Sequence, residues 1–234
     1  NVSNALSLST GNDKSQSYIS VATTNATGIM PNNDYDRYNF SFRNTTNFLN
    51  NKFILDTSAN YIIQNDKNMV SQGQYFNPLT SLYLFPRGED FSDVAVYERY
   101  DDLSGVNTQY WPYGDLGGVS SQNPYWIMNR MNRENDRRRY KLAASLQYNI
   151  IEGLNVQGRV SIDNTESKYT EKFHAGTVGN FAGPKGRYKE ENRLDRQVYA
   201  DVLANFNKTF NEFNVTANLG ASIKDLRMEL TSLH

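Results

Sequence analysis

Residues Arg139 to Thr165 read RYKLAASLQYNIIEGLNVQGRVSIDNT, and nearly every second side chain in this stretch is apolar. The apolar set runs from Tyr140 to Ile150 before the Glu152-Gly153 pair, and from Leu154 to Ile162 after it. A period of two residues indicates β-strands, and a short interruption containing glycine indicates a hairpin turn. The stretch therefore predicts a long antiparallel hairpin with one apolar face and one polar face.

The length and the polar face of this hairpin indicate the wall of a membrane barrel. Strands of globular proteins usually have about five or six residues, whereas a tilted strand needs about nine to eleven to cross a bilayer. Charged and amide side chains follow the second face along its whole length, which suits a border with water better than a packed core. We therefore expect a transmembrane β-barrel, with lipid outside and a hydrated lumen inside.

The composition agrees with this fold class. The chain has 234 residues, with 24 Lys and Arg against 25 Asp and Glu, and its mean hydropathy is -0.69. Barrels escape hydropathy analysis because only alternate strand residues are apolar. The balanced charge argues against nucleic-acid binding, and the absence of cysteine excludes disulfides and cysteine-ligated metals. The first residues do not form a signal peptide, so we expect either that one was removed or that the chain starts inside a longer protein.

The same alternation predicts eight strands, at about residues 4–10, 17–24, 37–47, 52–64, 139–150, 154–167, 193–206 and 212–224. Short turns between them alternate with long connections at residues 25–36, 65–138 and 169–191. All long connections therefore leave the sheet at one rim, as external loops of outer-membrane barrels do. We expect an all-β, antiparallel segment of a larger barrel, with a complete eight-stranded barrel as the alternative.

Several segments, taken in order, resemble the first barrel strands of SusC/RagA-type TonB-dependent outer-membrane transporters. The resemblance covers essentially the whole chain, although each motif alone is short. The motifs are the Gly11-Asn12-Asp13-Lys14 turn, Gly28-Ile29, Asn33-Asp34-Tyr35-Asp36-Arg37-Tyr38, Asn123-Pro124-Tyr125-Trp126, Asp136-Arg137-Arg138-Arg139-Tyr140 and Glu152-Gly153-Leu154.

The resemblance implies a fold and a function. Members of this family are large 22-stranded barrels in the outer membrane of Gram-negative Bacteroidetes, surrounded by lipid and lipopolysaccharide. They contain an N-terminal plug and a segment that contacts TonB, and a SusD-like surface lipoprotein covers them. They import oligosaccharides or oligopeptides with energy delivered by TonB. This chain contains about a third of the strands, without the plug or the TonB-contacting segment, so it resembles an N-terminal part of the barrel domain spanning residues 1–234.

Two sets of residues are candidates for contact with a transported solute. On the polar face, we expect five residues to border the lumen, the plug and the solute path: Asp56, Asn60, Arg159, Asp163 and Asp201. In the longest connection, Trp111, Tyr113, Tyr125 and Trp126 carry flat rings of the kind that stack on sugars. The alternative for the rings is that they join the long connection to a lid protein or to neighbouring loops.

A third candidate is the arginine cluster of Arg130, Arg133, Arg137, Arg138 and Arg139. Arginine suits bidentate contact with phosphate, so the cluster fits lipopolysaccharide at the outer rim, or it lines the lumen. Because Glu134 and Asp136 lie among these arginines, a solvated stretch of local ion pairs is an equal alternative.

Catalytic and metal-binding motifs are absent from the sequence. The two histidines, His174 and His234, do not form a metal-binding pattern, and no nucleophile or phosphate-loop motif occurs. The carboxylates Glu89, Asp90, Asp93, Asp101 and Asp102 suggest calcium, but without an EF-hand frame ordinary loop solvation is the simpler interpretation. We therefore expect no enzyme activity and no cofactor. The rival function is a surface receptor, an adhesin or a small barrel anchor whose loops bind a partner without transport.

Overall fold

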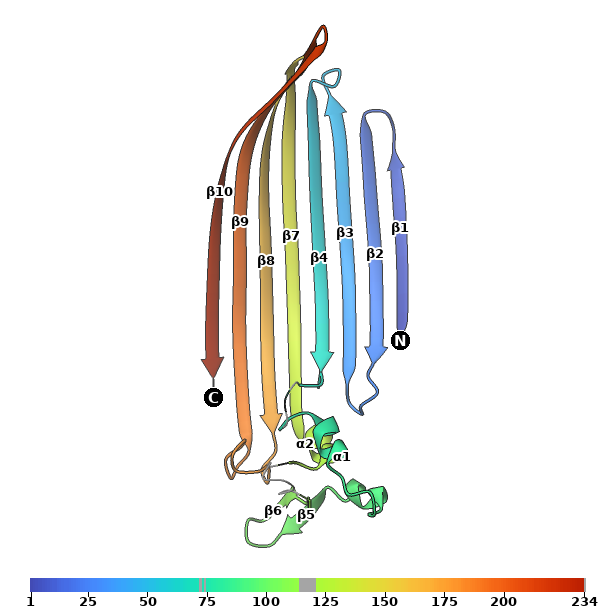
Figure 1. The fold of residues 1–234 in the computed structure, drawn as a ribbon, viewed down its shortest axis with the longest axis vertical. Helices are drawn as coiled ribbons and strands as arrows, with labels where there is room; N and C mark the ends of the chain where they lie inside the picture. Colours follow the sequence, from blue (N-terminus) through green and yellow to red (C-terminus); the bar gives the residue numbers. More distant parts are fainter. Residues whose placement is uncertain (72, 74, 114–120, 234) are drawn as a thin grey trace.

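The computed structural model describes residues 1–71, 73, 75–113 and 121–233. Eight strands form one antiparallel sheet in which each strand pairs with the next one along the chain (Figure 1). This confirms the predicted all-β fold. The strands are β1 (Val2–Gly11), β2 (Ser15–Thr27), β3 (Asp34–Phe48), β4 (Phe53–Lys67), β7 (Met131–Ile151), β8 (Leu154–Phe173), β9 (Arg187–Phe210) and β10 (Phe213–Leu233).

The main sheet is open. Strands β1 and β10 lie at its opposite edges and do not pair with each other (Figure 1). The described residues therefore do not form the closed eight-stranded barrel that the sequence left as an alternative.

Short and long connections alternate between the two ends of the sheet, as the sequence predicts (Figure 1). The short turns, at residues 12–14, 49–52, 152–153 and 211–212, define the short-turn end. In the first of them, the Asn12 side chain accepts hydrogen bonds from the backbone N–H groups of Lys14 and Ser15, both at 2.9 Å. The connections at the other end span residues 28–33, 68–130 and 174–186.

The strands are longer than the periodicity predicted. Strand β7 begins at Met131 instead of residue 139, β8 continues to Phe173, and β10 reaches Leu233. In the extensions of β7 and β8, charged and amide side chains occupy both faces, so the alternation disappears. In the extension of β10 the alternation continues with Leu226, Met228 and Leu230 on the opposite face. The backbone pairing continues through all three extensions. The connections predicted at 25–36, 65–138 and 169–191 are correspondingly shorter.

The cross-strand register places most of the apolar residues of the eight strands on one face, because directly opposite residues in an antiparallel pair point the same way. One such row ends at Asp225 on β10, whereas the apolar residues that β10 contributes to this face occupy alternate positions from Phe213 to Ile223, nearer the short-turn end. Beyond them, Leu226, Met228 and Leu230 lie on the polar face. The apolar belt therefore crosses the strands obliquely, as it does where strands tilt across a bilayer. The row contains Leu8, Ile19, Phe42, Ala59, Leu142, Ile162 and Val198.

The long connections fold into a small substructure that we call the cap, consisting of the described residues of 68–130 and 174–186. It contains α1 (Pro78–Tyr83), the 3-10 helix η1 (Phe91–Ala95), the β5 (Glu98–Asp101) and β6 (Val106–Gln109) hairpin, and α2 (Pro124–Arg130). Both α-helices begin with an asparagine N-cap followed by proline, the pairing that favours a helix start.

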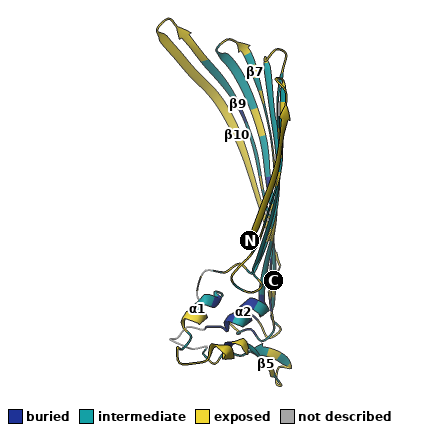
Figure 2. Cartoon of the chain, turned by 90° about the vertical axis from the view of Figure 1, so that its right-hand side faces the viewer, coloured by how far each residue is buried: buried dark blue, intermediate teal, exposed yellow. Residues whose placement is uncertain are grey.

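Dense packing is concentrated at the cap. Trp126 and Ile127 of α2 pack with Met131, Phe173 and Ala182 in one buried apolar cluster. In Figure 2, α2 contains buried residues while β10 is exposed along its length. None of the helices among the described residues is long and apolar enough to cross a membrane.

Candidate functional site

Ion pairs between neighbouring strands mark the polar face of the sheet. Arg159 on β8 and Asp201 on β9 are direct register partners, and the guanidinium donates two hydrogen bonds to the carboxylate, Nε to Oδ1 at 2.9 Å and Nη2 to Oδ2 at 2.7 Å. Arg139 on β7 holds Asp163 on β8 in the same way, at 2.8 and 2.5 Å. Two-point contacts of this kind fix the geometry of both side chains.

A third pair lies toward the other edge of the sheet. The Asp56 carboxylate accepts hydrogen bonds from Arg43 Nη2 and Thr45 Oγ1, both at 2.8 Å. Asn60 lies on the same face, between Ser41 and Lys141 in the register. The structure therefore places all five residues predicted for the polar face on one side of the sheet, and four of them are held in arginine–aspartate pairs.

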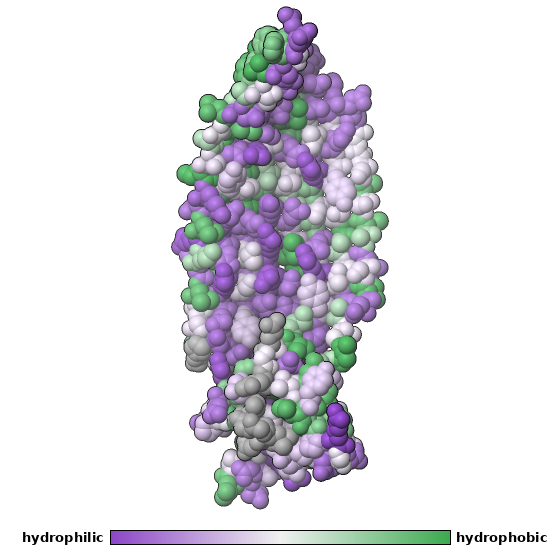
Figure 3. All heavy atoms as spheres, viewed as in Figure 1, coloured by the Kyte–Doolittle hydropathy of each residue, from purple (hydrophilic) through white to green (hydrophobic). Residues whose placement is uncertain are grey.

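A shallow groove of about 420 Å³ on this face brings Asp56 and Arg159 together. Both belong to one register row, linked through Ser145. The groove forms because the central strands carry small side chains here. The carboxylate of Asp56, the ammonium of Lys141 and the guanidinium of Arg159 border it. The side chains that line it on this face are Asp56, Lys141, Ala143, Ser145, Arg159, Ser161 and Tyr199. Hydrophilic side chains predominate over the face of the sheet seen in Figure 3.

Trp111 and Tyr113 lie in an aromatic cluster of the cap. Their rings meet edge to face with centroids 5.2 Å apart, and Tyr113 contacts Phe85 at 5.1 Å. The Trp111 indole N–H donates a hydrogen bond to Ser121 Oγ at 2.8 Å. Both rings are half-buried, so part of each ring surface remains accessible.

Trp126 has a different environment. Its side chain is fully buried in the apolar cluster of the cap, and its indole N–H donates to Thr177 Oγ1 at 3.1 Å. The neighbouring Tyr125 stacks on Tyr97 with centroids 6.4 Å apart. The ring of Trp126 therefore joins the two long connections, which is the alternative role considered for these rings, and it has no free face in this structure.

Buried amide side chains that the sequence pattern did not reveal hold the cap together. Asn123 Nδ2 donates to the carbonyl oxygens of Val94 at 2.9 Å and Tyr110 at 3.2 Å, and Gln122 Nε2 donates to the Tyr75 carbonyl at 2.7 Å. Both amide side chains are buried. The Asn-Pro pair at 123–124 was the available signal, because it marks a helix start inside a stretch without periodicity.

Arg133 on β7 connects the cap to the polar face of the sheet. Its guanidinium lies over the ring of Phe76 in the cap, 4.5 Å from the centroid, and over Phe173 on β8 at 5.5 Å. It also donates a hydrogen bond to Ser71 and lies 3.9 Å from the Glu171 carboxylate. Since Arg133 and Phe173 belong to the polar face, the cap covers the end of that face.

The five arginines predicted as one cluster separate in the structure. Arg133, Arg137 and Arg139 belong to the polar face, whereas Arg138 belongs to the opposite face. Arg130, in α2, donates two hydrogen bonds to the Glu98 carboxylate, at 2.8 and 2.9 Å. These hydrogen bonds lower the pKa of Glu98 from its usual value. Successive strand residues point to opposite faces, which separates Arg138 from Arg137 and Arg139. Arg130 is separate because it belongs to α2.

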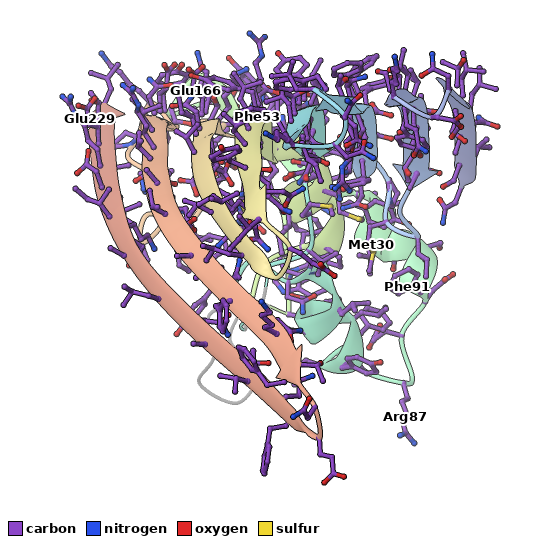
Figure 4. The ribbon with its side chains drawn as sticks, turned by 90° about the horizontal axis from the view of Figure 1, so that it is seen from above. Met30, Phe53, Arg87, Phe91, Glu166 and Glu229 are labelled. Atoms are coloured by element: carbon purple, nitrogen blue, oxygen red, sulfur yellow. The ribbon has the colours of Figure 1, made fainter. Side chains whose placement is uncertain are left out.

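Four of the methionines meet where the cap joins the sheet. Met30 from the β2–β3 connection, Met69 after β4, Met128 in α2 and Met131 on β7 line one small cavity, and the sulfur atoms in Figure 4 gather near Met30. Flexible thioether side chains fill irregular gaps well. Nearby, Asn32 Nδ2 donates to Asn129 Oδ1 at 2.8 Å, which adds a polar link between this connection and α2.

The loop carboxylates have local structural roles. Asp90 accepts a hydrogen bond from the Ser92 N–H at the start of η1, and Asp101 accepts from Leu103 and Ser104 in the β5–β6 turn. Within the described part of the chain, no three His, Cys, Asp or Glu residues are grouped so as to hold a metal ion. Burial lowers the pKa of His174, whose position beside Arg130 acts in the same direction; His234 lies outside the described residues.

Comparisons with known proteins give a match in structure only. No protein-family model matches the chain, and no curated protein matches it. The RagAB peptide importer in its closed-closed state matches with a TM-score of 0.61 at 13% identity, over 98% of this chain and 28% of that chain. The ferric-catecholate import receptor Fiu from E. coli K12 matches with a TM-score of 0.59 at 9% identity, over 97% and 32%.

A third match has a similar extent. FpvA of P. aeruginosa, in complex with a pyoverdine and iron, gives a TM-score of 0.59 at 13% identity, over 98% of this chain and 26% of that chain. The chain thus spans between 26% and 32% of the length of these three proteins. It shares their fold over nearly all of its residues, which is that of an antiparallel β-barrel wall.

Proposed function

We propose that this chain forms part of the wall of a TonB-dependent importer in the outer membrane of a Gram-negative bacterium. The observation that carries the proposal is the division of one long-stranded sheet into an oblique apolar belt and a polar face crossed by ion pairs. A membrane barrel requires this division, since lipid touches one face and water the other. The matches in fold to a peptide importer and a ferric-catecholate import receptor support it, and they fit a non-enzymatic role.

The edges of the sheet support a place in a larger barrel. Unpaired backbone groups in lipid cost several kcal/mol each, so open sheet edges do not occur there. In this proposal β1 and β10 therefore pair with further strands of the same barrel. The polar face then borders the lumen, where a plug and the solute path adjoin Asp56, Asn60, Arg159, Asp163 and Asp201.

The cap suits contact with a lid protein and with solute. Leu82, Tyr83, Leu84 and Phe91 expose apolar surface on the cap, with Tyr83 84% exposed. Apolar surface of this kind marks interaction sites, and in the proposal a SusD-like surface lipoprotein binds there. The half-buried rings of Trp111 and Tyr113 remain the candidates for contact with an oligosaccharide or an oligopeptide. TonB would act through a segment that this chain does not contain.

Uptake by the whole protein tests the proposal. Cells that carry or lack the complete gene would be supplied with labelled oligosaccharides and oligopeptides, with TonB active or depleted. The proposal expects uptake of at least one class that requires both the gene and TonB. Surface binding without uptake would contradict it and would favour a receptor or an adhesin.

A further inference from the structure

Three arginines occupy one register row of the polar face, near the cap. Arg37 on β3, Arg137 on β7 and Arg193 on β9 lie in this row, with Gln64 on β4 and Ser167 on β8 between them. Their side chains share one face, because opposite residues in antiparallel strands point the same way. Neighbouring strands are about 4.8 Å apart, so successive arginines are separated by about 10 Å.

Two of these arginines have only neutral partners. Arg37 Nε donates to Asn39 Oδ1 at 3.1 Å, and Arg137 Nε donates to Ser167 Oγ at 3.3 Å. Among the described residues, no carboxylate forms an ion pair with either guanidinium, whereas Arg193 pairs with Asp195 at 2.8 Å. The arginines farther from the cap, Arg43, Arg139 and Arg159, each hold an aspartate.

Two acidic groups of this face lie one row closer to the cap, and both have other partners. Asp66 accepts hydrogen bonds from Gln64 at 3.3 Å and from Asn135 at 3.0 Å. Glu191 pairs with Lys189 at 2.6 Å. Arg37 and Arg137 therefore keep N–H donors for an additional acceptor. Arg137 is exposed and Arg37 is half-buried, so both can be reached.

The row also lies at the boundary between the cap and the sheet. Arg133, which anchors the cap, precedes Arg137 by four strand residues, or about 14 Å along β7. If the polar face borders the solute path, a molecule that passes the cap meets Arg37 and Arg137 before it meets the aspartate-paired Arg43, Arg139 and Arg159.

We propose that Arg37 and Arg137 form a recognition site for carboxylate groups of the solute, and that the importer prefers acidic solutes to neutral ones. This inference rests on the proposed function, because it requires that the polar face borders the solute path. Guanidinium groups bind carboxylates through paired, charge-assisted hydrogen bonds. Gln64, between them in the row, separates the two cations, so a solute with two carboxylates can engage both.

The test uses the complete importer together with its partner lipoprotein. The probes are a glutamate-rich oligopeptide with its glutamine counterpart, and a uronate oligosaccharide with its neutral counterpart. Arg37→Gln, Arg137→Gln and the double variant are compared with Arg138→Gln. Arg138 is the matched control, since it is the adjacent exposed residue on the opposite face.

The expected result is a preference of the unmodified protein for the acidic member of at least one pair. Each single variant should lower that preference about tenfold, which corresponds to about 1.4 kcal/mol, and the double variant more, because each substitution removes charge-assisted hydrogen bonds to the carboxylate. Arg138→Gln should leave it unchanged, and added salt should weaken it.

Several outcomes overturn the inference. The inference is wrong if the protein binds the acidic and the neutral member of each pair with equal affinity. It is also wrong if the preference for the acidic member survives in the double variant, or if Arg138→Gln lowers this preference as much as Arg37→Gln and Arg137→Gln do. None of these three results affects the proposed function, provided that the protein still imports a solute. Failure of the complete protein to import any solute would overturn the proposed function, and this inference with it.

Discussion

Trp126 shows how single residues support the cap. Its buried ring connects α2 with the β8–β9 connection, whereas the ring of Trp111 is half-buried. Trp126→Ala should cost about 3–5 kcal/mol of the stability of the cap, as truncation of a large core side chain does. Trp111→Ala should cost less. Hydrogen exchange of cap amides in the complete protein would measure both changes, and equal protection in the two variants would contradict the assignment of Trp126 as a core residue.

The Arg130–Glu98 pair predicts how the cap responds to pH. The hydrogen bonds from Arg130 lower the pKa of Glu98 in the folded state, so the stabilisation is complete above the unfolded value of about 4.5 and is lost as the pH falls through the lower, folded value. The pair is partly exposed, so the loss should be about 1 kcal/mol or less. Hydrogen exchange of β5 and α2 amides between pH 7 and pH 3 would measure it.

His174 also makes the stability of the cap depend on pH, but at higher pH than Glu98 does. A control is therefore needed to separate the two effects. Burial lowers the pKa of His174, because the charged imidazolium is disfavoured in the folded cap. The stability of the cap should therefore decrease as the pH falls below the unfolded value of about 6.5. In the Glu98→Gln variant the change below pH 4.5 should disappear while the change from His174 persists. An unaltered acid response in this variant would refute the assigned role of Glu98.

At the scale of residues, the sequence predicted which face a strand residue occupies but not its partners. Asp163 and Asp201 were recognised as polar-face residues because alternation alone decides the face. Their partners Arg139 and Arg159 depend on the register between strands, which a single strand does not encode. Trp126 was grouped with Trp111 because residue type does not reveal burial.

At the scale of elements, the β7–β8 turn depends on Gly153. This residue has φ of 83°, and a Cβ there would lie 2.3 Å from the Asn207 carbonyl oxygen. Gly153→Ala should therefore destabilise the hairpin by about 1–3 kcal/mol. Gly158 on β8 is the control, since no atom lies within 4 Å of its added Cβ. Equal effects of the two substitutions on urea unfolding in lipid would contradict this account of the turn.

The order of the strands could be predicted from the sequence because each hairpin showed a period of two and a turn. Their full length could not, since both faces of β7 from Met131 to Arg138 carry polar groups and the pattern vanishes there. The cap was predicted only as an irregular connection. Its fold depends on contacts between residues far apart in the chain, such as Trp126 with Thr177, which local patterns do not show.

At the scale of the whole molecule, the two faces of the sheet should respond differently to an added charge. Val160 belongs to the apolar belt, and Ser161 is the next residue on the polar face. Val160→Arg should destabilise the complete barrel in lipid by about 2–4 kcal/mol, the cost of an arginine near the bilayer midplane. Ser161→Arg should change the free energy of unfolding by less than about 1 kcal/mol. Similar losses in the two variants would mean that the faces are not divided between lipid and water.

The division of the sheet into a lipid face and a water face can be measured most directly with spin labels in the complete protein in a bilayer. Labels at Leu146 and Val160 report on the apolar face, and labels at Gln147 and Ser161 on the polar face. We expect oxygen, which concentrates in lipid, to relax the first pair more strongly, and a water-soluble nickel chelate to relax the second pair more strongly. Equal accessibility of both pairs to the two reagents would contradict the account.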